Sequence, residues 1–392
     1  MADNPPLVSV PPLDVRGEGW GLALADPDDR TMNRDLCALF SSVRLESALS
    51  LTQERDPDFF VLPRLHQGPF ATAVGVDDHG QVVGCGTLCV REGWLSGELI
   101  KTGYLCDLRV APGFRGGKHL ARAYRHFMAH MEARFGAELF TTVIFDSNKA
   151  AIAALTQRSD KRLDQPIYRP MTPFQMVSVQ FTRKRSAPTG PNSRVSQAGP
   201  EDLGPLTEYL ASRAKTRVLG EHLTAERFAE RLSLWPGFSL SDFFIAKDGG
   251  KIVGCLAPWD TSAFKRTRVL GYRGGMLWQK RAFNAAASLM GFPKLPPPGD
   301  PFRFVFLTHL EVDDENPDIL RELLLAAYQR LHGQNLHFMS AFVPRGSPLA
   351  SAFKGFMTTK TAMTLYAVHR PDSRFADVDL TTRRPGFEMA LS

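Results

Sequence analysis

The stretch Tyr104–Leu120, YLCDLRVAPGFRGGKHL, decides the fold of this chain. An apolar strand runs through Val-Ala-Pro into an Arg-Gly-Gly turn and continues directly into a helix. Glycines let the backbone N–H groups of a tight turn point at one spot, and the following helix adds its unpaired first-turn amides and the positive end of its dipole. The pattern predicts a site for an anionic group such as the diphosphate of a cofactor.

A second pattern lies downstream. The segment ELFTTVIFD (Glu138–Asp146) is typical of a buried strand, and Asn148-x-x-Ala151 opens a helix after it. Further apolar segments predict a strand at Gly21–Ala25, a helix over Asp29–Ser50 and a helix at Ala121–Phe135. Two apolar runs around Asp77-Asp78-His79-Gly80 predict a hairpin, and Leu99–Val110 supplies the next strand.

These two ordered segments resemble motifs A and B of the GNAT acyltransferase superfamily. Motif A is a strand followed by V-x-P and R/Q-x-x-G-x-G/A ahead of a helix, and four positions match it: Val110, Pro112, Arg115 and Gly116. Two positions depart from it, because Lys118 and Leu120 stand where the motif has its later glycines. The resemblance covers about the first 185 residues and implies an N-acetyltransferase that uses acetyl-CoA.

The composition sets limits on the remaining possibilities. A length of 392 residues favours two domains, and a hydrophobic fraction of 43% suits soluble globular domains. The N-terminus has no basic signal region and no segment approaches 18 uninterrupted apolar residues, so we expect a cytoplasmic protein without a membrane span. Five scattered cysteines argue against a disulfide framework or a zinc site, so no metal is predicted. A net charge of +6 favours anionic cofactors mildly and does not imply nucleic acid.

An internal echo suggests that the architecture is duplicated. The pattern Asp78-x-Gly80-x-x-Val83-Gly84-Cys85 recurs as Asp248-x-Gly250-x-x-Val253-Gly254-Cys255. Between the copies, RKRSAPTGPNSR (Arg183–Arg194) has the basic, Pro/Gly/Ser-rich composition of an exposed linker. We therefore predict an α/β (α+β) fold of two tandem GNAT-like domains, each a mixed, mostly antiparallel central sheet flanked by helices.

The predicted boundaries follow from this duplication. Residues 1–185 form the acetyl-CoA-binding catalytic domain, 186–194 the linker, 195–372 a degenerate GNAT-like domain, and 373–392 a C-terminal tail. In the second half Phe302–Val312 imitates the motif A strand and Asp318–Leu331 its helix, but the loop between them carries four carboxylates and no glycine or arginine. Those carboxylates would repel a diphosphate, so the second half is not expected to hold coenzyme A in the same manner.

One segment has no counterpart in the first half. Met276–Phe302 ends in the proline-rich run FPKLPPPGDPF. It is either a lid over the site or a proline-stiffened surface crossover.

The resemblance assigns the cofactor residues. Backbone groups of the motif A strand would bind the pantetheine arm and the thioester, and the turn and helix start would bind the diphosphate. The candidates are Leu108, Arg109, Val110, Arg115, Gly116, Gly117, Lys118, His119, Leu120 and Ala121, with Asn148 beside the pantetheine arm.

At the positions of the superfamily's usual general base and general acid, this sequence has other residues. Cys106 stands where many members of the superfamily have a glutamate, and Leu155 where they have a tyrosine. Asp107 is the first candidate base if the strand bulges there, since simple alternation would turn it away from the site. Tyr104 is a candidate acid or a half-buried aromatic residue, and Cys106 a nucleophile or a small core residue.

The acceptor site would lie near the segment Arg55-Asp56-Pro57-Asp58-Phe59-Phe60. Arg55, Asp58 and Phe59, with Trp94 on the following hairpin, are the candidate acceptor-binding residues. The expected acceptor is a small-molecule amine or a protein or peptide amine, without nucleic acid or membrane as partner, and a homodimer is possible. Two alternatives remain open: transfer of a longer acyl or aminoacyl group, and an acyl-CoA-binding regulatory module without turnover.

Overall fold

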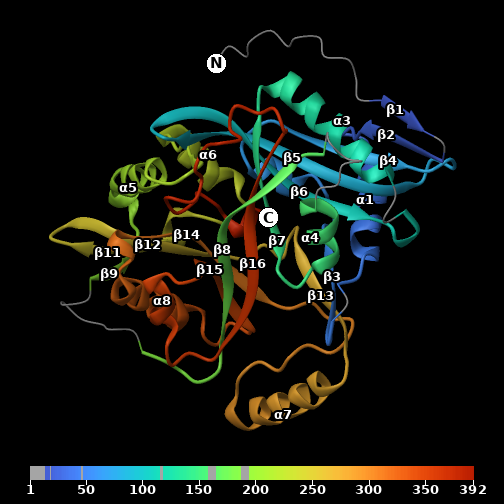
Figure 1. Cartoon of the computed structure of the whole chain (residues 1–392). Coiled ribbons are helices and arrows are strands. Elements are labelled where there is room, and N and C mark those ends of the chain that lie inside the picture. Colours follow the sequence, from blue (N-terminus) through green and yellow to red (C-terminus); the bar gives the residue numbers. More distant parts are fainter. Residues whose placement is uncertain (1–13, 18, 46, 115–117, 158–164, 187–193) are drawn as a thin grey trace.

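The computed structural model describes residues 14–17, 19–45, 47–114, 118–157, 165–186 and 194–392. Its centre is one 14-stranded sheet that runs through the whole molecule, with strand order β1-β2-β4-β5-β6-β7-β16-β8-β15-β14-β12-β11-β9 and β10 paired to β5 (Figure 1). Helices cover this sheet and pack on it through buried apolar faces.

The first half of the chain supplies one wing of the sheet. Its elements are β1 (Asp14–Gly17), β2 (Trp20–Leu24), α1 (Arg30–Ser42), β3 (Leu49–Glu54), α2 (Val61–Leu65), β4 (Phe70–Val76), β5 (Val82–Leu95), β6 (Glu98–Val110), α3 (Lys118–Phe135), β7 (Leu139–Phe145), α4 (Lys149–Thr156) and β8 (Ile167–Gln180).

The second half supplies the other wing. Its elements are β9 (Val195–Gln197), α5 (Leu203–Lys215), β10 (Gly220–Glu221), α6 (Ala225–Leu234), β11 (Phe244–Asp248), β12 (Lys251–Trp259), β13 (Arg266–Tyr272), α7 (Gly275–Met290), β14 (Phe304–Val312), α8 (Pro317–Leu331), β15 (Phe338–Pro344) and β16 (Thr358–His369). A short 3-10 turn, Met389–Leu391, lies near the C-terminus.

The two wings share their central strands. Strand β16 comes from the end of the chain, yet it pairs antiparallel with β7 of the first half on one side and with β8 on the other. Strand β8 in turn pairs with β15 of the second half. The mixed, mostly antiparallel sheet flanked by helices confirms the predicted fold class, while the predicted boundaries between two domains stay a prediction.

A local arrangement is repeated in the two halves. Asp107 in β6 and His309 in β14 each adopt a left-handed backbone conformation, with φ of 55° and 50°. Each lies at a register shift, Asp107 against β5 and His309 against β12. The thiol of Cys85 donates to the carbonyl oxygen of Asp107 at 3.3 Å, and Cys255 donates to that of His309 at 3.3 Å. The repeated bulge agrees with the echo in the sequence.

A second, two-stranded sheet ties the halves together away from the main sheet. Strand β3 pairs antiparallel with β13, and Glu54 of β3 binds both Arg266 and Arg268 of β13. The hydrogen bonds to these guanidinium groups hold the pKa of Glu54 below its usual value, although burial acts against them. Helix α7 follows β13 and lies below the main body in Figure 1.

One expected helix needs correction. The helix expected over Asp29–Ser50 spans only Arg30–Ser42, and strand β3 begins at Leu49. The helical spacing of buried apolar residues ends at Val43, and β3 alternates buried and half-buried residues as a strand does. The expected hairpin, in contrast, is present: Gly80 has φ 76° and the Asp77 carboxylate accepts from the amides of His79 and Gln81.

The packing of β6 gives a stability prediction. A methyl group on Gly103 would lie 2.6 Å from Phe140 Cδ1 and 2.8 Å from Leu88 Cδ1, inside a core of fully buried side chains. Gly103→Ala should therefore lower the free energy of unfolding by about 1–3 kcal/mol in chemical denaturation. The matched change Gly75→Ala meets atoms no closer than 3.8 Å and should be tolerated to within about 0.5 kcal/mol. Equal losses in both variants would contradict this account of the β6 packing.

Candidate functional site

The candidate site begins where two parallel strands separate. Strands β6 and β7 pair only from Thr102 to Tyr104, and both continue beyond this point. The diverging ends, residues 105–110 of β6 and 142–145 of β7, both line one large cavity. In this stretch β6 still pairs with β5 on one edge, but its other edge no longer pairs with β7 and faces the opening. On that edge the Leu105 carbonyl accepts from the Thr142 hydroxyl at 2.9 Å. This wedge provides backbone donors and acceptors for a bound chain.

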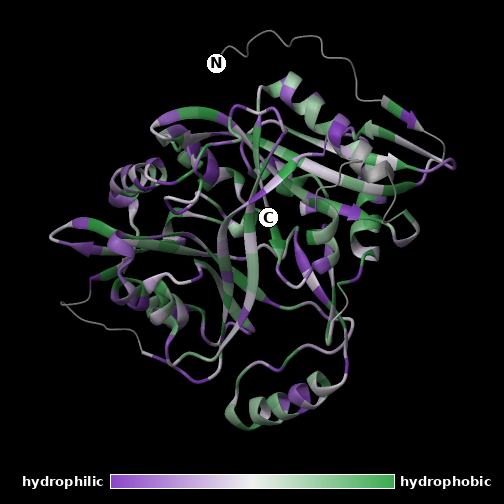
Figure 2. Cartoon of the chain, in the orientation of Figure 1, coloured by the Kyte–Doolittle hydropathy of each residue, from purple (hydrophilic) through white to green (hydrophobic). Residues whose placement is uncertain are grey.

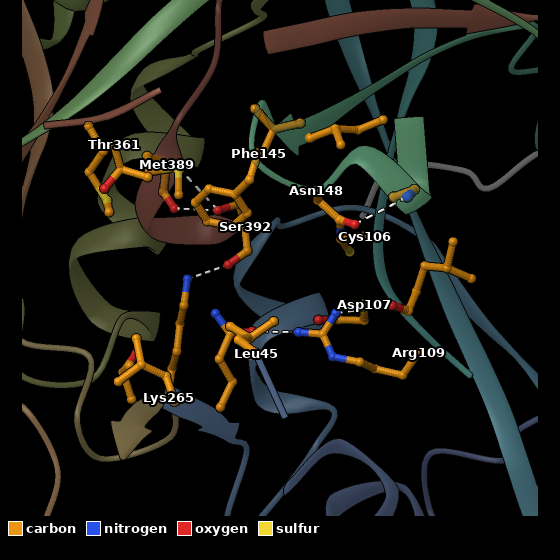
Figure 3. A pocket seen from close by; sticks show the side chains of 18 of the residues that line it. Leu45, Cys106, Asp107, Arg109, Phe145, Asn148, Lys265, Thr361, Met389 and Ser392 are labelled. Carbon is orange, nitrogen blue, oxygen red and sulfur yellow. Dashed lines mark hydrogen bonds between the residues drawn. The ribbon is translucent and has the colours of Figure 1, made fainter. Parts of the chain in front are cut away.

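The cavity has a volume of about 1370 Å³ and crosses from one half of the protein to the other. From the wedge it passes Phe145, Met389 and Thr361 (Figure 3) and continues to the inner side of α7. Its far walls are mainly apolar and include Met276, Phe283, Phe292, Phe302, Phe304 and Phe338. Hydroxyl groups of β8, β15 and β16 contribute a narrower polar strip.

A buried ion pair lies at the start of the wedge. Arg55 Nη2 donates to Asp107 Oδ1 at 2.9 Å, and each side chain is only 2% exposed. The strand bulges at Asp107, and the residue lines the cavity. A bulge at this position was the condition under which the sequence allowed Asp107 a functional role. Asp107 Oδ2 and the Nε and Nη1 atoms of Arg55 have no hydrogen-bond partner among the described residues. The pair therefore retains capacity to bind a polar group inside the cavity.

A lysine from the second half reaches the same cavity. Lys265 is 6% exposed, its ammonium lies 4.9 Å from the centre of the Phe306 ring, and it donates to the carbonyl of Ala390 at 3.3 Å and to an oxygen of Ser392. Figure 3 shows Lys265 and Ser392 pointing toward each other across from Asp107. Burial, reinforced by the charge of Arg55, lowers the pKa of Lys265 to about 7. A base that changes protonation near neutral pH thus lies in the cavity.

The other two predicted catalytic residues occupy a buried cluster. The Tyr104 ring stacks on His66 with 5.9 Å between ring centres, and burial raises its pKa well above the usual range. A hydrogen bond to Cys89, together with burial, raises the pKa of Cys106 well above its usual range. Burial opposes ionisation of Cys89, yet hydrogen bonds from Cys106 and His66 lower its pKa to about 6. The thiol that faces the cavity, Cys106, is therefore the one held in its neutral form.

Some of the predicted cofactor-binding residues line the cavity, and others lie outside the described residues. Leu108, Arg109 and Val110 line the cavity, and Arg109 donates to Gln53 Oε1 at 2.6 Å. Asn148 lines it too, while its side chain accepts from the amide of Ala151 at the start of α4. Arg115, Gly116 and Gly117 lie outside the described residues, and for Lys118, His119, Leu120 and Ala121 only the helical backbone is described.

The predicted acceptor residues do not form one group. Arg55 lines the cavity, whereas Asp58, Phe59 and Trp94 are absent from its walls. The Asp58 carboxylate binds Arg64 at 2.7 Å, Phe59 is fully buried between aromatic rings, and Trp94 packs against His222. Sequence reasoning missed Lys265, Met389 and Ser392, because no motif marks them and they approach the wedge only through the fold.

Two negative findings apply to the parts of the chain that the structure describes. No group of three or more His, Cys, Asp or Glu side chains there is arranged to hold a metal ion. No described helix is long and apolar enough to cross a bilayer.

One segment of the chain matches a known protein family. Residues 35–158 match the model of the acetyltransferase (GNAT) family. No curated protein matches the sequence significantly.

Solved structures with this fold are distant in sequence. An N-myristoyltransferase of Saccharomyces cerevisiae with bound myristoyl-CoA aligns with a TM-score of 0.62 at 11% identity, over 94% of this chain and 87% of the other. A GCN5-related N-acetyltransferase of Sphaerobacter thermophilus aligns with a TM-score of 0.53 at 14% identity, over 90% and 96%. The glucosamine N-acetyltransferase region of a fungal β-N-acetylglucosaminidase gives 0.56 at 13%, over 90% and 38%. Residues 35–158 thus match the GNAT acetyltransferase family, and the chain shares its fold with these N-acyltransferases.

Proposed function

We propose that this protein transfers an acyl group longer than acetyl from acyl-CoA to an amine acceptor. The observation that carries the choice of acyl group is the cavity of about 1370 Å³ that continues from the wedge to the apolar inner side of α7. Pockets for drug-sized ligands occupy about 300–1,000 Å³, so an acetyl thioester alone would leave most of this space unfilled. Two observations support a longer acyl group: α7 contributes apolar side chains to the far wall of the cavity, and the yeast N-myristoyltransferase of similar fold holds myristoyl-CoA.

The reaction uses the residues around the wedge. The amine nitrogen attacks the thioester carbonyl carbon, a carbon–nitrogen bond forms, and the carbon–sulfur bond breaks to release coenzyme A as a thiol. Backbone N–H groups of β6 beyond Tyr104 stabilise the negative charge that develops on the carbonyl oxygen. The free Asp107 Oδ2 attracts the incoming ammonium group and orients it toward the thioester.

Two residues compete for the proton of the attacking amine. Asp107 is the base that the sequence suggests, but its charge is compensated by Arg55 at 2.9 Å. Lys265 has a pKa of about 7, so much of it is neutral at physiological pH and can accept a proton. We assign proton acceptance to Lys265 and orientation of the amine to Asp107.

The chain-length proposal is tested by calorimetric titration with acetyl-, octanoyl- and myristoyl-CoA. Each buried methylene contributes about 0.8 kcal/mol, so affinity should rise steeply with chain length until the cavity is filled. Ala286→Trp, on the inner side of α7, should abolish this gain, whereas Ala285→Trp on the exposed neighbouring position should keep it. Equal affinities for all three thioesters would support acetyl transfer or a shorter acyl group instead.

Turnover is tested separately from binding. Mass spectrometry of reactions with a panel of amines should detect the N-acyl product together with free coenzyme A. Tight binding of acyl-CoA without product from any amine would favour the alternative of a regulatory acyl-CoA-binding module.

The proton assignment predicts a pH profile. With an aromatic amine, which stays neutral across the range, kcat/KM of the wild type should rise with pH and level off above about 7, because only the neutral Lys265 accepts a proton. Lys265→Met should lower kcat/KM about 10²–10⁴-fold and abolish its rise with pH. Asp107→Asn should keep the rise of kcat/KM with pH for this neutral amine, and should raise KM for an amine that binds as its ammonium ion. If the rise of kcat/KM with pH disappeared in Asp107→Asn and persisted in Lys265→Met, Asp107 would instead be the base.

A further inference from the structure

Helix α7 presents an apolar outer face. Four of the nine exposed large apolar side chains among the described residues belong to it, and its Leu289, Trp278 and Met290 are the most exposed of all, at 89%, 67% and 62%. Trp278 and Leu289 are eleven residues apart, which places them on the same side of a helix three turns from each other. Figure 2 shows α7 set apart from the body of the molecule, with green apolar bands beside a purple hydrophilic one. An exposed apolar face of this kind indicates an interaction surface.

The sequence around this face is basic. No aspartate or glutamate occurs between Asp260 and Asp300, and seven cations do: Lys265, Arg266, Arg268, Arg273, Lys280, Arg281 and Lys294. Of these, Lys265 is buried in the cavity, and Arg266 and Arg268 bind Glu54. Arg281 lies 4.8 Å from the centre of the Trp278 ring, so its positive charge accompanies the most prominent aromatic residue of the face. The combination of exposed Trp and Leu side chains with Lys and Arg is that of helices which lie in the membrane interface.

A hollow of about 380 Å³ lies beside α7. Its walls carry the cations Lys280, Lys294 and Arg303 against a single carboxylate, that of Asp300. Burial and the charge of Arg303 lower the pKa of His337, also in the wall, to about 4, so that this imidazole is neutral at physiological pH. The hollow has a net positive charge and the size for a phosphate-bearing head group.

The segment after α7 holds this surface in place. Leu295 donates from its amide to Asn284 Oδ1 at 2.8 Å, the Tyr272 hydroxyl donates to the Pro296 carbonyl at 2.8 Å, and Phe283 packs on Phe292. The exposed face is therefore the outer side of a fixed element whose inner side lines the cavity.

We propose that α7 and the adjacent hollow dock this protein on an anionic phospholipid surface. Trp278 and Leu289 enter the interface between head groups and acyl chains, while Arg281, Lys280 and Lys294 contact head-group phosphates. The sequence alone gave no membrane partner, because the signal lies in the exposure of α7 and not in hydropathy. This inference stands on the exposed face and its charges and does not rest on the proposed acyl transfer.

A second copy of the chain is the less suitable occupant. Self-association through a two-fold axis would bring the same face of two molecules together, and Lys280, Arg281 and Lys294 of one copy would lie against those of the other. The hollow beside α7 offers only the Asp300 carboxylate to compensate that repulsion.

Flotation of the full chain with vesicles tests the proposal in the absence of acyl-CoA. The protein should float with vesicles of phosphatidylcholine and phosphatidylglycerol and remain largely unbound with phosphatidylcholine alone. Each Lys or Arg near an anionic surface contributes about 1 kcal/mol, so Arg281→Glu/Lys294→Glu should reduce partitioning by at least roughly tenfold. Trp278→Ser/Leu289→Ser should reduce it to a similar extent.

Matched variants control for charge and for apolar area. Lys149→Glu/Lys251→Glu changes the same net charge at exposed positions elsewhere, and Leu99→Ser/Leu234→Ser removes exposed leucines of other elements. Both controls should float like the wild type, and thermal unfolding should confirm that every variant is folded. Absence of vesicle binding, equal binding to neutral vesicles, or equal losses in the controls would overturn the proposal. An α7-dependent dimer in sedimentation that persists without binding to vesicles would overturn it in favour of a second copy.

Discussion

Backbone hydrogen bonds from β16 to β7 on one edge and to β8 on the other connect the two halves of this protein. Strand β8 belongs to the first half by sequence and pairs with β15 of the second, and β16 runs in the opposite sense. Because these central strands are shared, neither wing of the sheet can close its hydrogen-bond ladder without residues from the other half. The segment after β16 then returns to the middle of the molecule, where Met389 and Ser392 reach the cavity.

Local patterns predicted much of the architecture. The turn at Asp77–Gly80, strand β14 and helix α8 each have a short-range cause, such as a left-handed glycine or an apolar period. The limits of the site strands were also predictable, because an apolar run followed by Val-x-Pro ends a strand before a helix. The pairing of β16 with β7 was not, since residues more than 200 positions apart leave no local pattern. Lys265 was missed for the same reason: only folding brings it opposite Asp107.

The site combines one feature that sequence reasoning could foresee with one that it could not. A bulge at Asp107 was the stated condition for a functional carboxylate, and the backbone there is left-handed. The buried partner of that carboxylate, Arg55, had been considered only as a residue for acceptor binding. At the opposite wall, Lys265 is 6% exposed and has lost most of the hydration that stabilises its charge. This desolvation lowers the pKa of Lys265. Proton chemistry in this cavity thus depends on burial as well as on residue type.

The C-terminal segment fills the wedge of the second half that corresponds to the candidate wedge of the first half. Strands β14 and β15 also pair over three residues and then diverge, and the tail enters there: Glu388 accepts from the His309 amide at 3.0 Å, Arg384 donates to the Leu310 carbonyl at 3.5 Å, and Phe387 packs on Phe342. A tethered segment has a high effective concentration at such a place, so this second wedge serves as a structural joint that holds Met389 and Ser392 at the cavity.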